Sequence, residues 1–92
     1  MNLRSKFKGL KKNKENTKKL MIELMAISSI DFTVEHMAHK LYKYGFTTRE
    51  SDCFRFMNEL CVEQKLIYNG CKPIKLDGFI IGCDHIFGLI RR

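Results

Sequence analysis

The amino-acid sequence predicts one α+β domain in which three helices precede a small antiparallel β-hairpin, with a basic arm before the first helix. Apolar residues recur at helical spacing in three successive segments between residues 16 and 64. Gly45 stands between the second and third segments, where a glycine commonly ends a helix. Beyond residue 66 the chain is rich in β-branched and aromatic residues, interrupted by glycines. We therefore divide the 92 residues into an arm, 1–15, and a folded domain, 16–92.

The arm holds almost all the excess charge of the chain. Residues 1–19 contain eight basic residues and one acidic residue, whereas the remainder contains nine of each, so the net charge of +7 belongs to the first segment. A localised basic segment attracts phosphate backbones or anionic lipid. The alternative is a solvated tail that only keeps the protein soluble. Leu3, Phe7 and Leu10 follow helical spacing, so the arm is able to form a basic amphipathic helix.

The first two helices of the domain have recognisable ends. The first is expected from Asn16 to Ser28, with Asn16 or Thr17 as its N-cap. The second is expected from Val34 to Tyr44, capped by Thr33 and ended by Gly45, because glycine adopts the left-handed conformation without strain.

A third helix is expected to begin at a Thr-x-x-Glu capping box, Thr47 to Glu50, and to end near Gln64. Helical spacing directs one set of residues inward: Cys53, Phe54, Met57, Leu60 and Cys61. The opposite face carries Thr48, Ser51, Asp52, Arg55, Asn58 and Glu59.

The last third of the chain predicts short strands. Leu66 to Tyr68 is the first, followed by a tight turn at Asn69-Gly70 and a loop from Cys71 to Asp77. Residues 79–81 and 86–90 are the other strands, separated by residues 82–84.

The sequence favours a binding protein over an enzyme. No nucleophile and base stand in a recognisable arrangement, and 92 residues leave little room for a substrate cleft. We expect no cofactor and no metal, because the four cysteines have irregular gaps and His36 and His39 lack a third ligand. No segment is long and apolar enough to span a bilayer, and the N-terminus lacks the features of a signal peptide.

We therefore expect a cytoplasmic location, or a nuclear or host-cell intracellular one if the source is eukaryotic or viral. Disulfides are then disfavoured. Cys53 and Cys61 are expected to be small core residues.

The order helix, short strand, helix, glycine turn, helix and strand pair resembles the winged-helix superfamily of small DNA-binding regulators. The residues that carry the resemblance are Phe32-Thr33-Val34, Met37-Ala38, Leu41, Gly45-Phe46-Thr47 and the run from Leu60 to Ile67, in which Lys65 replaces the usual glycine. The resemblance implies a winged helix-turn-helix fold whose helix from Thr48 to Gln64 enters the major groove of double-stranded DNA, while the hairpin touches the adjacent backbone. It also implies a transcriptional regulator, of the small type found in viruses, phages and plasmids, that binds as a homodimer. The natural dimer surface is then the first helix of the domain or the arm, with Leu3, Phe7 and Leu10.

Base reading is assigned to Arg55 for guanine and Asn58 for adenine, because their donors and acceptors match those base edges. Basic and polar residues around them are expected to contact phosphates. The complete candidate site is Arg4, Lys6, Lys8, Lys11, Lys12, Lys43, Thr48, Arg49, Ser51, Arg55, Asn58, Lys72 and Lys75.

One feature favours a different partner. The third helix contains Arg49 and Arg55 but also Glu50, Asp52, Glu59 and Glu63, and carboxylates repel phosphates. The alternative function is therefore a winged-helix module that docks on a host or partner protein and modulates it. Attachment to RNA or to a membrane surface through the arm is a third option.

Overall fold

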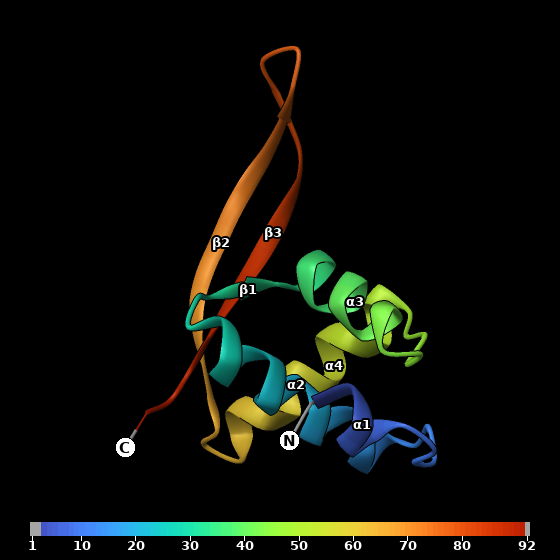
Figure 1. The fold of residues 1–92 in the computed structure, drawn as a ribbon. Helices are drawn as coiled ribbons and strands as arrows, with labels where there is room; N and C mark the ends of the chain where they lie inside the picture. Colours follow the sequence, from blue (N-terminus) through green and yellow to red (C-terminus); the bar gives the residue numbers. More distant parts are fainter. Residues whose placement is uncertain (1–2, 92) are drawn as a thin grey trace.

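The computed structural model describes residues 3–91, except for the side chain of Arg4. Its helices and strands are, in chain order, α1 (Leu3–Phe7), α2 (Lys14–Ser28), β1 (Phe32–Thr33), α3 (Val34–Lys43), α4 (Glu50–Val62), β2 (Leu66–Leu76) and β3 (Phe79–Leu89). The three strands form one antiparallel sheet in the order β1-β3-β2. Figure 1 shows the helices gathered at the foot of a long twisted hairpin that rises away from them. The α+β class is confirmed, but the described chain has four helices where three were predicted.

The additional helix belongs to the basic arm. Leu3 and Phe7 of α1 are buried in the same core as the later helices, and the Phe7 ring meets that of Phe46 edge to face at 6.2 Å. The prediction that Leu3 and Phe7 offer a dimer surface is therefore wrong, because their own chain covers them. Helix α2 begins earlier than predicted, at Lys14, because Asn13 is its N-cap.

The corner between α3 and α4 is partly as predicted. The Thr33 hydroxyl accepts a hydrogen bond from the His36 amide at 3.0 Å, and Gly45 has a φ of +83°, as a helix-ending glycine requires. The predicted capping box is wrong. The N-cap of α4 is Arg49, whose side chain makes no capping hydrogen bond. Thr47 lies two residues before this position and is too far from the first amides of the helix to cap them.

The core joins the helices to the foot of the hairpin. Leu66 opens β2 as a buried residue, and Phe87 of β3 pairs with Phe32 of β1 deep inside the molecule. The predicted inward face of α4 is slightly rotated. Phe56, which the prediction assigned to neither face, is buried, whereas Phe54 is only half-buried because it faces the base of the hairpin.

The hairpin differs most from the prediction. Its turn is at Asp77-Gly78, where both residues have positive φ, as a two-residue turn requires. The predicted turn at Asn69-Gly70 is instead a bulge, in which these two residues stand opposite Ile86 alone. Residues 71–76 of the predicted loop and the predicted break at residues 82–84 are strand, so β2 and β3 are eleven residues each.

Asn69 has a structural task that explains the bulge. Its amide donates to the Asp31 carboxylate at 2.9 Å across Gly88, where an added Cβ would lie 2.8 Å from both side chains. The hydrogen bond of Asn69 therefore joins the loop before β1 to the hairpin. Because the two side chains pass close to the backbone of residue 88, only glycine fits at this position.

The cysteines divide into two pairs with different roles. Cys71 and Cys83 form a disulfide across the hairpin, so the expectation of no disulfide is wrong; the two strands bring the cysteines within 5.7 Å between Cα atoms. Cys53 is a buried core residue as predicted, and burial raises the pKa of its thiol to about 12. Cys61 is only partly buried.

Within residues 3–91 no helix has the length and apolar character needed to cross a membrane.

Candidate nucleic-acid interface

The exposed face of α4 is the centre of the candidate site. Its buried face is formed by Cys53, Met57 and Leu60, so Ser51 and Arg55 point to the opposite side and are exposed. Asn58 lies on the same side and is half-buried. The prediction that this helix presents a polar face is therefore confirmed for these three residues.

Arg55 and Asn58 on this face each have a partner within the same helix. The Arg55 guanidinium is 3.2 Å from the Asp52 carboxylate one turn earlier and lies over the Phe56 ring. An exposed pair of this kind contributes little, so Arg55 can exchange it for another anion or a base edge. The Asn58 amide donates one N–H to the Phe54 carbonyl at 3.0 Å, which leaves its second N–H and its carbonyl oxygen for other partners.

The carboxylates at the end of α4 are neutralised within the molecule. Glu59 binds Lys14 at 2.8 Å and Lys18 at 3.4 Å. Glu63, just after the helix, binds Lys18 and also Lys65, the latter at 3.6 Å. These two glutamates therefore face α2 and its lysines and are not a free acidic patch.

The ion pairs shift the pKa values of both partners. The hydrogen bond from Lys18 lowers the pKa of Glu63, and that from Lys14 lowers the pKa of Glu59. The hydrogen bond to Glu63 raises the pKa of Lys18, although burial of the lysine opposes this. All three groups are therefore charged near neutral pH, and Lys18 is one of two polar residues buried among those described.

The segment before α2 lies along the other end of α4. A cleft of about 320 Å³ separates them, with Lys12 and Lys14 on one wall and Thr48 and Arg49 on the other. The Lys12 ammonium lies 4.8 Å from the centre of the Phe46 ring, a cation–π contact that holds the segment against the corner. The tertiary structure thus places basic residues from two distant segments beside the N-terminus of α4.

The other predicted residues at this end have varied settings. Thr48 is half-buried and donates its hydroxyl hydrogen to the Phe46 carbonyl at 3.2 Å, so it is less available than predicted. Lys8, Lys11 and Lys43 are exposed, and no ion pair involves them among the described residues. The side chain of Arg4 lies outside the described residues.

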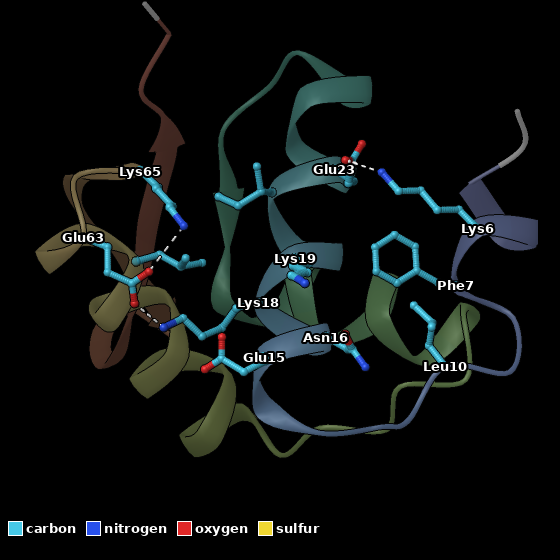
Figure 2. A pocket seen from close by; sticks show the side chains of 12 residues that line it. Lys6, Phe7, Leu10, Glu15, Asn16, Lys18, Lys19, Glu23, Glu63 and Lys65 are labelled. Carbon is cyan, nitrogen blue, oxygen red and sulfur yellow. Dashed lines mark hydrogen bonds and ion pairs between the residues drawn. The ribbon is translucent and has the colours of Figure 1, made fainter.

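Lys6 lies on a different surface. It binds Glu23 of α2 at 2.7 Å across the rim of a groove of about 520 Å³ between α1, α2 and the end of α4 (Figure 2). Figure 2 shows Phe7 and Leu10 on one side of this groove and the Lys18–Glu63–Lys65 ion pairs on the other. The Lys6–Glu23 ion pair joins α1 to α2 at this groove. Lys6 is therefore not part of the candidate interface.

The base of the hairpin borders α4 on its second flank. The Phe54 ring stacks on His85 of β3 with ring centres 4.6 Å apart, and the Tyr68 hydroxyl is 2.8 Å from His85 Nδ1. The sequence analysis did not predict this cluster of Phe54, Tyr68 and His85, because their proximity depends on the pairing of β2 with β3. Lys72 and Lys75 stand further out on β2, both exposed, with Lys72 opposite Asp84.

His36 is packed against a core residue and is not fully solvated. Its ring stacks on Phe32 with centres 4.3 Å apart, and burial, followed by the nearby Lys40, lowers the pKa of its imidazole. No three histidines, cysteines or carboxylates come together as a metal site within residues 3–91.

Comparisons of this chain with known protein families, with curated proteins and with solved structures found no match.

Proposed function

We propose that this protein binds double-stranded DNA, with α4 in the major groove and the basic segment before α2 on the adjacent phosphates. The observation that carries the proposal is the exposed polar face of α4, flanked by Lys12 and Arg49 at one end and by the base of the hairpin along its side. An α-helix fits the width of the major groove of B-DNA, where Arg and Asn side chains distinguish bases.

The element order supports the same proposal. The proposal of a winged helix is supported by the order of a helix, a short strand, two helices joined at a glycine corner, and a hairpin whose second strand pairs with the short strand. On this basis we further propose a role in transcriptional regulation.

The ion pairs at the end of α4 reduce the electrostatic objection to a DNA partner. Glu59 and Glu63 are held by lysines of α2, and Asp52 is held by Arg55. Asp52 is paired only with Arg55, and Glu50, exposed in the first turn of α4, has no ion pair among the described residues. The alternative of a docking module for a partner protein therefore keeps the support of these two carboxylates and ranks second.

The proposal is tested by the fluorescence anisotropy of a labelled duplex of random sequence, titrated with the protein at several salt concentrations. We expect binding that weakens steeply with salt, because neutralising phosphates releases counterions. The variant Lys12→Ala is expected to lower the salt slope by about one and the affinity for all sequences, and Lys19→Ala is the matched control, since Lys19 is an exposed lysine on the Figure 2 groove.

Arg55→Ala tests the base-reading role on the best sequence selected from a duplex library. We expect a loss of about 10- to 100-fold on the selected site and a smaller loss on random duplex. Deleting residues 1–14 is not a suitable test, because it removes Leu3 and Phe7 from the core. No affinity for duplex at low salt, or equal losses in Lys12→Ala and Lys19→Ala, would contradict the proposal.

A further inference from the structure

The outer half of the hairpin carries exposed apolar residues on both faces, and neither face is covered. Leu76 and Phe79 form the last pair before the turn, and Ile80 stands opposite Lys75, with Ile81 unpaired at a second bulge. Phe79, Ile80 and Ile81 keep 73%, 67% and 61% of their surface exposed. Three consecutive exposed apolar residues on a projecting ribbon are a typical sign of an interaction surface.

The two edges of this ribbon differ in how they resist pairing with another strand. The free edge of β2 carries Lys72, Pro73 and Lys75 in its outer half, and both lysine and proline are residues that discourage edge-to-edge association. The edge of β3 is covered by β1 only at Ile86 and Phe87. From residue 79 to residue 83, β3 has no charge and no proline.

We infer that residues 79–83 of β3 pair with the same segment of a second copy of this chain, so that two hairpins join into one four-stranded antiparallel sheet. A two-fold axis brings identical segments together in antiparallel orientation, as an isologous interface requires. Main-chain groups that point away from β2 then gain partners, and the isoleucines of the two copies cover each other.

Charge supports a second copy as the partner. Segment 79–83 meets its own copy without like-charge repulsion, whereas self-pairing of β2 would bring Lys72 and Lys75 near their counterparts. A bilayer is a poorer partner, because the exposed Asp77 at the tip of the hairpin would be the deepest group inserted.

This inference does not depend on the proposed function. It replaces the dimer surface expected from Leu3 and Phe7, which the core of the same chain occupies.

Sedimentation velocity over a wide concentration range tests the inference. We expect a reversible change from the 10.8 kDa monomer to twice that mass, because five residues a side form a small interface. Ile80→Glu is expected to weaken the dimer by more than about tenfold, since each dimer carries the change twice, while the new carboxylate opposite Lys75 preserves the hairpin. Ile27→Glu is the matched control, because Ile27 is 65% exposed on α2, and it should leave the dimer unchanged.

Hydrogen exchange identifies the edge that pairs. At concentrations that favour the dimer, amides of residues 79–83 should gain protection and those of residues 72–76 should not. A monomer at every concentration, an equal effect of the two glutamate variants, or protection of β2 instead of β3 would overturn the inference. So would a monomer that sediments with phosphatidylserine vesicles and loses this binding in Ile80→Glu, which would identify a lipid surface as the partner.

Discussion

The helical part of the molecule and the outer half of its hairpin belong to one chain but are stabilised in different ways. The helices, β1 and the foot of the hairpin share one core that contains every buried apolar residue described. From Ile67 to Ile81 no residue is buried, and the strands depend on backbone pairing and one disulfide. Stability therefore resides in the globule, whereas the surfaces available to partners are the exposed face of α4 and the outer half of the hairpin.

The largest effect should separate the two regions directly. Leu41→Ala removes a fully buried side chain of α3 and is expected to lower the free energy of unfolding by about 2–5 kcal/mol. Leu76→Ala makes the same chemical change on the exposed ribbon and should stay within about 0.5 kcal/mol. Urea denaturation of dilute protein, followed by circular dichroism, measures both. Similar losses in the two variants would mean that the ribbon is packed on something when the protein is folded.

A smaller and local effect is expected from the disulfide. Replacing Cys71 and Cys83 by serine opens a loop with a sequence separation of 12, and chain entropy assigns about 3 kcal/mol to closing such a loop. Because the ribbon lies outside the core, the loss should appear as faster amide exchange in residues 70–84 and only weakly in the thermal midpoint of the helices. Wild-type protein treated with a thiol reductant is the control and should match the serine variant. A large fall in the thermal midpoint would show that the ribbon and the globule unfold together.

The smallest effect is expected from the ion pairs that Lys18 makes with Glu59 and Glu63. Lys18→Met keeps a long apolar side chain in place and removes one of the two lysine partners of each of Glu59 and Glu63, so its cost should be well below that of Leu41→Ala. The raised pKa of Lys18 means that the ion pairs stabilise the fold below the ordinary lysine pKa of about 10.4 and lose this contribution as pH rises through the raised value. The lowered pKa values of the glutamates mean that the contribution is present above about pH 4.3 and is lost as pH falls through them.

The difference in unfolding free energy between wild type and Lys18→Met should therefore be constant near neutral pH and shrink at both extremes. Denaturation measured across this pH range checks it. A difference that does not vary with pH would mean that Lys18 acts only by packing.

The helices were largely predictable because their signals are local. Thr33 and Gly45 mark the ends of α3 through hydrogen bonds and backbone angles that involve neighbouring residues only. The start of α4 was placed wrongly because two threonines precede it, and the sequence could not tell which residue would be the N-cap. The hairpin was placed wrongly because both Asn69-Gly70 and Asp77-Gly78 are turn signals, and only strand pairing selects between them.

By itself, the sequence determined the α+β class, the three longer helices and the concentration of positive charge near the N-terminus, because helical periodicity, glycine stops and charge are properties of adjacent residues. Only the tertiary structure decided that α1 joins the core, that lysines of α2 neutralise the carboxylates of α4, and that Cys71 meets Cys83. These contacts join residues far apart in the chain, and their geometry is fixed only when the helices pack and the strands choose their register.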